Sequence, residues 1–170
     1  MLNRDFAEML VALSAERVQF LVVGAYAMAA HGLPRATGDI DIWVRPSQVN
    51  ARRVLRALDR FGAPRFDLTL ADLSREGTVF QLGLPPRRID ILTSIDGIEF
   101  ATAWKTRTVG VVEHVTIPIL DRAALIRNKR AAGRPKDLLD VQILEATAPP
   151  AAPPSRTRRV PKPRRRSRGA

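Results

Sequence analysis

The segment 38–44, Gly-Asp-Ile-Asp-Ile-Trp-Val, alternates polar and apolar residues with a period of two. This period predicts a β-strand, because successive side chains of a strand point to opposite faces of a sheet. Ile40 and Ile42 then enter a core, while Asp39 and Asp41 lie side by side on the other face. Two carboxylates this close repel each other unless a cation or a proton lies between them. The chain must therefore build a sheet with one apolar face and one acidic face.

Carboxylates arranged in this way are ligands for hard divalent ions such as Mg²⁺, although two aspartates on a solvated sheet face have the same pattern. A third carboxylate, Asp90, stands in the alternating segment 88–92, Arg-Ile-Asp-Ile-Leu. If this strand pairs beside residues 38–44, Asp90 joins the acidic face. Three converging carboxylates suit two metal ions, one to activate a hydroxyl and one to hold a triphosphate. Without metal, we expect Asp39→Asn or Asp41→Asn to stabilise the fold.

A glycine lies upstream, at the junction between a strand and a helix. Residues 18–23, Val-Gln-Phe-Leu-Val-Val, predict a short buried strand that ends at Gly24, and small helix-compatible residues follow over 25–31. The N-terminus of a helix attracts anions, and a glycine lets a phosphate approach the backbone. An ordinary tight turn has the same sequence, so the junction gains weight only together with the aspartates.

Periods of 3.6 and of two, in different segments, predict an α/β (α+β) fold. Ser47 is a suitable N-cap and Gly62 a suitable C-terminal glycine for the helix between them. The expected helices are 2–15, 25–31, 48–61, 121–131 and 135–146, with short helical segments at 71–76 and 99–105. The expected strands are 18–23, 38–44, 79–83, 88–95, 108–112 and 115–119.

The composition excludes several classes of protein. The 170 residues include no cysteine, which excludes disulfides, thiolate nucleophiles and cysteine-ligated metals. The two histidines, His31 and His114, are too few for a histidine-rich metal site. No apolar run approaches the ~20 residues of a membrane span, and the N-terminus lacks the apolar stretch of a secretory signal. We therefore expect a cytoplasmic protein without membrane contact.

The basic charge is concentrated at the C-terminus. Residues 151–170 hold eight of the 28 Lys and Arg residues and no acidic residue, so 20 basic and 17 acidic residues remain in 1–150. Proline is frequent after residue 148, and Val160 is the one large apolar residue there. We predict a domain over residues 1–148 and a disordered basic tail over 149–170. Such a tail binds nucleic acid without sequence preference, docks on an acidic protein, or only solubilises the chain.

The stretch 22–44 resembles the signature of the polymerase-β-like nucleotidyltransferase superfamily, in which a glycine-led strand–helix turn precedes Asp-x-Asp. Its Arg-x-Thr-x-Asp-Ile-Asp portion, residues 35–41, is most similar to small bacterial nucleotidyltransferases related to the abortive-infection AbiEii toxins. The late stretch 129–140 is similar to their Lys…Arg-x-Lys-Asp-x-x-Asp element. The resemblance covers residues 15–146 and implies a mixed sheet flanked by helices, with a C-terminal helix pair.

The resemblance also implies an activity, a cofactor and partners. The reaction is transfer of a nucleoside monophosphate from an NTP to an acceptor hydroxyl, with Mg²⁺ or Mn²⁺ as cofactor and pyrophosphate as the second product. The acceptor is a tRNA or a protein, and the related toxins imply an antitoxin partner. The resemblance implies three metal ligands, Asp39, Asp41 and Asp90. It also makes Asp90 the candidate base that accepts the proton of the acceptor hydroxyl.

Further positions follow from the same resemblance. Gly24 and Ala25 would lie at the nucleotide phosphates, where Ala25 replaces the family's usual Gly or Ser and offers no hydroxyl. Arg35, Lys129 and Lys136 would meet phosphate charge, and Asp137 would orient a lysine or act as an alternative base. The charges of 129–140 also fit a merely structural helix pair.

Three other polar residues are expected to be structural. Thr37 should brace its loop by a local side-chain–backbone bond, His31 should be a hydrogen-bonded packing residue, and His114 should be exposed in a hairpin turn. A second function remains open alongside the enzyme, namely a nucleic-acid-binding module with an inactive nucleotidyltransferase fold and a polycationic tail. Deleting the tail should spare NTP binding in the first case and remove the main activity in the second.

Overall fold

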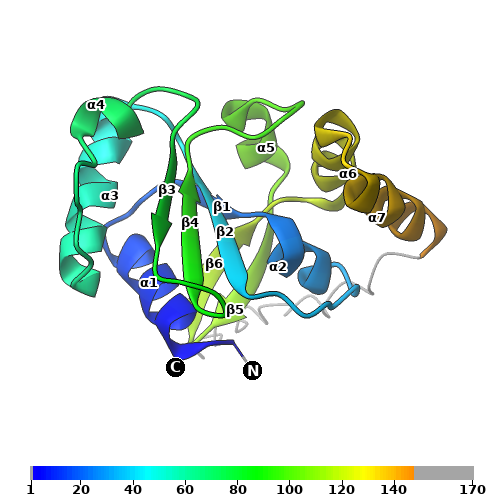
Figure 1. The fold of residues 1–170 in the computed structure, drawn as a ribbon, viewed down its shortest axis with the longest axis horizontal. Coiled ribbons are helices and arrows are strands. Elements are labelled where there is room, and N and C mark those ends of the chain that lie inside the picture. Colours follow the sequence, from blue (N-terminus) through cyan, green and yellow to red (C-terminus); the bar gives the residue numbers. More distant parts are fainter. Residues whose placement is uncertain (1, 148–170) are drawn as a thin grey trace, which may run out of the picture.

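The computed structural model describes residues 2–147, and the predicted tail at 149–170 lies outside them. The fold is mixed α/β, with helices around one mixed sheet (Figure 1). Its helices are α1 (Arg4–Ala15), α2 (Gly24–Ala30), α3 (Gln48–Phe61), α4 (Leu70–Leu73), α5 (Phe100–Thr106), α6 (Arg122–Ala132) and α7 (Pro135–Ala146). Its strands are β1 (Phe20–Val22), β2 (Asp39–Val44), β3 (Val79–Leu82), β4 (Arg88–Leu92), β5 (Thr108–Val112) and β6 (Val115–Ile119).

The predicted signals for the two ends of α3 are confirmed. The Ser47 hydroxyl accepts a hydrogen bond from the Asn50 N–H at the start of α3. Gly62 and Gly133 end α3 and α6 in the left-handed conformation, with φ of 80° and 64°. The hairpin of β5 and β6 has the predicted bounds. The strands β1 and β4 are shorter than predicted, and β4 ends at Leu92 instead of residue 95.

The sheet has six strands in the order β3-β4-β2-β1-β6-β5. Strand β2 lies between β1, with which it is antiparallel, and β4, with which it is parallel. In the β2–β4 register Asp39 lies opposite Arg88, and Asp41 lies opposite Asp90. The pairing on which the predicted acidic face depended is therefore confirmed.

The two faces of the sheet have different neighbours. Ile40 lies with residues of α1 and α2, including Leu10 and Tyr26, and the apolar side chains on this face form a large part of the core. Trp43 is two residues after Asp41 on β2, so its side chain is on the acidic face. It packs edge-on against Phe100 of α5, with ring centroids 4.9 Å apart. Helices α6 and α7 pack against each other on the opposite side of the view from α3 and α4 (Figure 1).

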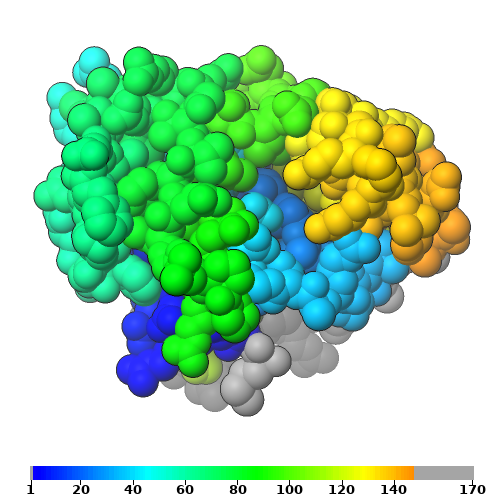
Figure 2. Space-filling model, viewed as in Figure 1, coloured from blue at the N-terminus to red at the C-terminus, as the bar shows by residue number. Residues whose placement is uncertain are grey.

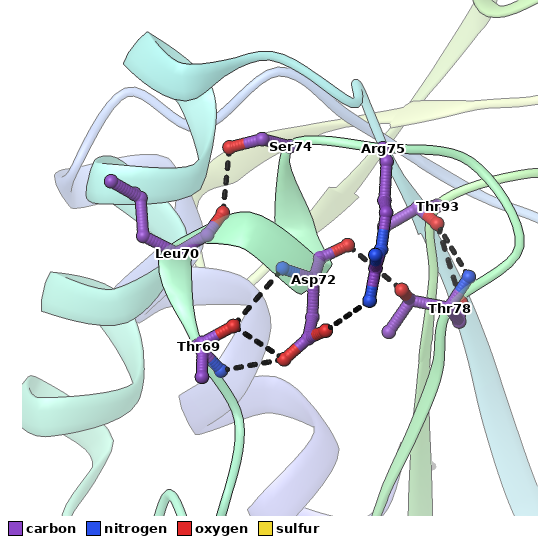
Figure 3. Close-up of polar contacts among 7 residues, drawn as sticks. All are labelled: Thr69, Leu70, Asp72, Ser74, Arg75, Thr78 and Thr93. Carbon is purple, nitrogen blue, oxygen red and sulfur yellow. Dashed lines mark hydrogen bonds and ion pairs between the residues drawn. The ribbon is translucent and has the colours of Figure 1, made fainter.

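The short helix α4 is held by a capping box (Figure 3). The Thr69 hydroxyl accepts a hydrogen bond from the Asp72 N–H, and the Asp72 carboxylate accepts one from the Thr69 N–H. The Thr78 hydroxyl donates to the Asp72 carbonyl, and the Thr78 N–H donates to the Thr93 hydroxyl. This network joins α4 to the start of β3 and to the end of β4, so it fixes the outer edge of the sheet.

Among residues 2–147, no helix combines the length and the apolar character needed to cross a membrane.

Candidate functional site

A cleft of about 230 Å³ opens over the acidic face of the sheet. Figure 2 shows the hollow between the helix pair α6–α7 and the strands β3 and β4, with the α2 segment at its floor. All nine residues predicted for the site line this cleft, although their positions span 114 places in the chain. They are Gly24, Ala25, Arg35, Asp39, Asp41, Asp90, Lys129, Lys136 and Asp137. The lining is completed by Thr37, Arg88 and Arg134, which sequence reasoning did not place in the site.

The three strand carboxylates have unequal partners. Asp39 contacts Arg88, with Nη2 2.5 Å from Oδ2, and accepts a hydrogen bond from the Thr37 hydroxyl at 2.6 Å. Asp90 contacts the same Arg88, with Nε 2.9 Å from Oδ1, and accepts a longer bond from Gln81 at 3.3 Å. Within the described part of the chain, the Asp41 side chain has no hydrogen-bonding partner. The negative charge that the fold leaves least compensated is therefore on Asp41.

The surroundings of Asp41 change its protonation. Burial, followed by the negative charges of Asp39 and Asp90, raises the pKa of Asp41 from 3.8 to about 6, against smaller opposing effects of Arg88 and Arg134. Like charges directly opposite each other on paired strands are destabilising, and Asp41 and Asp90 form such a pair. A carboxylate with a raised pKa in a cleft marks a candidate functional site.

Gly24 makes room for Asp41. Its φ is +59°, and a Cβ atom built on it would lie 2.0 Å from Asp41 Oδ2. The Val23 N–H donates to the Asp41 carbonyl at 3.0 Å, which ties this turn to β2. The turn therefore needs glycine both for its left-handed backbone and for the approach of the carboxylate.

Gly24→Ala is expected to lower the free energy of unfolding by more than about 2 kcal/mol. The left-handed backbone alone costs an alanine about 1–2 kcal/mol, and the new methyl group must also displace the Asp41 carboxylate. Gly32→Ala is the matched control, because Gly32 has φ of +86° and no atom within 4 Å of a Cβ built on it. Urea unfolding measures both variants, and equal losses would contradict the close approach of Asp41.

The helix pair supplies a buried ionic cluster. Lys129 Nζ lies 3.0 Å from Asp137 Oδ1 and 2.6 Å from Asp140 Oδ2, and all three side chains are at most 8% exposed. Arg35, from the loop before β2, reaches the same Asp140 with Nη2 2.6 Å from Oδ1. Burial opposes ionisation of Asp137, but its bonds with Arg134 and Lys129 outweigh burial and hold its pKa below the ordinary value. The cluster joins the loop, α6 and α7 through charge-assisted bonds.

These contacts distinguish the predicted cations. Lys129 and Arg35 were expected to contact phosphate. In the structure both already bond to carboxylates, so their contacts position the surrounding elements. Asp137 orients Lys129, which is one of its two predicted roles. Lys136 is exposed at the rim of the cleft. Asp140 is fully buried, so the charges of this helix pair do not all lie on its surface, and a structural role of the pair stays open.

Arg134 and Arg88 are the residues that sequence reasoning missed. Arg134 precedes α7, bonds to Asp137, and lines the cleft with a side chain that is 75% exposed. A second cleft, of about 370 Å³, shares Gly24, Asp41 and Arg134 with the first. A signal for Arg88 was available, because it stands two residues before Asp90 on one strand and so shares its face.

The structural expectations for three polar residues are confirmed. His31 is buried, and its Nε2 is 2.8 Å from the Leu120 carbonyl oxygen. His114 is exposed in the β5–β6 turn, with φ of 69°. Thr37 braces its loop through bonds to the Asp39 backbone and carboxylate.

In residues 2–147, no three His, Cys, Asp or Glu side chains are grouped closely enough to hold a metal ion as they stand. At the acidic face the Arg88 guanidinium bonds to both Asp39 and Asp90. The donor atoms are nevertheless carboxylate oxygens, the type that Mg²⁺ prefers, and Asp41 carries a charge that the fold does not pair. In kind and in charge the three aspartates fit a divalent ion.

No protein-family model matches the chain, and no curated protein is significantly similar to it in sequence.

Proposed function

We propose that this protein is a metal-dependent nucleotidyltransferase with a polymerase-β-like fold. It transfers a nucleoside monophosphate from an NTP to an acceptor hydroxyl. The acceptor oxygen bonds to the α-phosphorus, the bond from that phosphorus to the bridging oxygen breaks, and pyrophosphate leaves. The observation that carries the proposal is the register of β2 and β4, which puts Asp39, Asp41 and Asp90 on one face of a cationic cleft.

The charge of the cleft supports an anionic substrate bound with a cation. Its lining holds five cationic side chains, those of Arg35, Arg88, Lys129, Arg134 and Lys136, and four carboxylates. An NTP carries several negative charges, which need both the cations and a divalent ion near the carboxylates. Mg²⁺ or Mn²⁺, when bound by the three aspartates, would polarise the phosphate and stabilise the charge of the transition state.

The residues of the chain divide the remaining work. Lys136 and Arg134, which are exposed at the cleft, are placed to contact phosphate oxygens. Ala25, at the start of α2, can offer its backbone N–H to a phosphate oxygen but has no side-chain hydroxyl to add a second bond. Asp90 is the candidate base that accepts the proton of the acceptor hydroxyl. Lys129, Asp137 and Arg35 position the helix pair and the loop around this reaction.

The resemblance to AbiEii-related proteins extends the proposal to the biological role. On this proposal the protein is a toxin that modifies a tRNA or a protein, and an antitoxin neutralises it. The second cleft supports a reaction with two substrates, because it meets the first at Gly24, Asp41 and Arg134.

Calorimetric titration of the full chain with each of the four NTPs in Mg²⁺ tests the proposal. We expect one NTP to bind with metal and to lose binding in EDTA or in the Asp39→Asn/Asp41→Asn double variant. Asp59→Asn is the matched control, because Asp59 is an exposed aspartate on α3 whose partner is Arg65. If no NTP binds in Mg²⁺ or Mn²⁺, or if binding is the same in the double variant, the proposal is wrong.

A further inference from the structure

Arg88 occupies an unusual place for a cation. It comes from β4, lies opposite Asp39 in the parallel register, and shares the acidic face with the three aspartates. Its guanidinium bonds to Asp39 through Nη2 and to Asp90 through Nε, at 2.5 and 2.9 Å. The side chain is 28% exposed, so water screens these ion pairs only in part. One guanidinium thus bridges carboxylates from two neighbouring strands.

The bridge determines which carboxylates are available to another cation. Arg88 compensates one of the three negative charges, so the acidic face keeps the charge that one divalent ion would neutralise. Asp41 is the carboxylate that Arg88 does not contact. The second oxygens of Asp39 and Asp90 accept hydrogen bonds from Thr37 and Gln81, so all four oxygens of these two carboxylates already have a donor. A divalent ion held by all three aspartates therefore competes with these donors, of which Arg88 is the charged one.

We propose that Arg88 is a positioning residue that competes with the divalent ion for Asp39 and Asp90, and so sets the metal affinity of the site. The inference rests on the proposed function, which supplies the metal. In the metal-free protein, Arg88 reduces the repulsion between the carboxylates of β2 and β4 and so stabilises the pairing of these two strands. Metal binding then costs two charge-assisted hydrogen bonds, which weakens it. The released guanidinium faces the cleft in which the proposed phosphates lie, and its planar fork suits them.

Electron paramagnetic resonance of Mn²⁺ with the full chain tests this competition without any nucleotide or activity. Arg88→Gln is expected to tighten Mn²⁺ binding about tenfold or more, because the two carboxylates are released while the overall charge changes by one. Arg87→Gln is the matched control, since it removes the same charge from the neighbouring, exposed residue. Arg88→Lys keeps the charge but not the planar fork, so the Mn²⁺ affinity of this variant should lie between that of Arg87→Gln and that of Arg88→Gln.

The thermal melting temperature gives a second readout. Arg88→Gln should melt at a lower temperature than the wild type in EDTA, and Mn²⁺ should restore it. If Arg88→Gln does not fold in EDTA, Arg88→Lys carries the test, and it must bind Mn²⁺ more tightly than the wild type does.

The outcomes separate this inference from the proposed function. If the wild type binds Mn²⁺, and Arg88→Gln and Arg88→Lys bind it no more tightly than Arg87→Gln does, the role of Arg88 is wrong. The proposed function is then unaffected. Absence of Mn²⁺ binding in the wild type and in both Arg88 variants at millimolar metal overturns both. Tighter binding in the Arg88 variants that is lost on adding Asp41→Asn supports both.

Discussion

Asp41→Asn is expected to reduce the proposed nucleotidyl transfer strongly and, in the same protein, to raise the free energy of unfolding in metal-free buffer. Activity should fall about 100- to 1,000-fold, the usual loss when one group that stabilises a charged transition state is removed. Stability should rise because Asp41 is a half-buried carboxylate without a partner beside two others. Transfer of label from α-labelled NTPs to tRNA or protein measures the first effect, and urea unfolding in EDTA measures the second.

The stability effect has a defined pH dependence. The folded state holds the Asp41 proton more tightly than the unfolded state does, since the folded pKa is about 6 and the unfolded value is 3.8. Ionised Asp41 therefore destabilises the fold as pH rises through this range. At about 1.4 kcal/mol for each tenfold change in proton affinity, the cost above the folded pKa is about 3 kcal/mol. The asparagine amide is also a polar group that loses water on burial, so it keeps part of this cost. We therefore expect Asp41→Asn to raise the free energy of unfolding by about 2 kcal/mol at neutral pH, and by nothing near the unfolded pKa.

Asp39→Asn is the control for this effect, and the structure corrects the sequence expectation for it. Asp39 is paired with Arg88 and bonded to Thr37, so its replacement removes an attractive contact and should not stabilise the metal-free protein. A stability of Asp41→Asn that equals or falls below that of the wild type at neutral pH in EDTA would contradict the uncompensated charge. Mg²⁺ should stabilise the wild type and not Asp41→Asn.

Asp140→Asn is expected to lower the free energy of unfolding by about 3 kcal/mol, at the lower end of the cost of breaking a buried ion pair. Asp140 is fully buried between Lys129 and Arg35. Its loss leaves Lys129 with Asp137 alone and leaves Arg35 without its carboxylate. For a chain of this size the melting temperature should fall by roughly 6–12 °C, which calorimetric scanning measures.

Two variants test whether burial of the charge causes this loss. Asp59→Asn changes an exposed aspartate that pairs with Arg65 on the surface, and it should cost less than about 1 kcal/mol. Lys136→Ala changes an exposed residue of the same helix and should also cost little. A loss in Asp140→Asn no larger than in these controls would contradict a stabilising role for the cluster.

Elements with a strong local period were predictable to within a few residues. The helical period of α3, with Ser47 and Gly62 at its ends, and the alternation of β2 and β4 needed no tertiary contact to be recognised. Strand β4 ends before the predicted bound, although Thr93 still exchanges hydrogen bonds with Thr78 just beyond the last paired residues, Val79 and Leu92. The order of the six strands was not predictable, since no local pattern encodes which strand lies beside which.

The same distinction applies to the site. The positions of Asp39 and Asp41 followed from one strand, and that of Asp90 followed once two alternating strands were assumed to pair. The bridge from Arg88 to Asp39 depends on the β2–β4 register, which a shift of one residue would abolish. The Lys129–Asp140 contact depends on the angle between α6 and α7, for which the sequence around Gly133 carries no readable signal.

The contact between Arg35 and Asp140 also has a consequence in time. These residues are 105 positions apart, and a ribosome that adds about 5–20 residues per second needs roughly 5–20 s to pass from one to the other. Strand β2 is made at the start of that interval and β4 about halfway through it, whereas α7 is the last helix of the described chain. During its own synthesis the protein therefore exposes its three aspartates for seconds before the helix that closes the cleft exists.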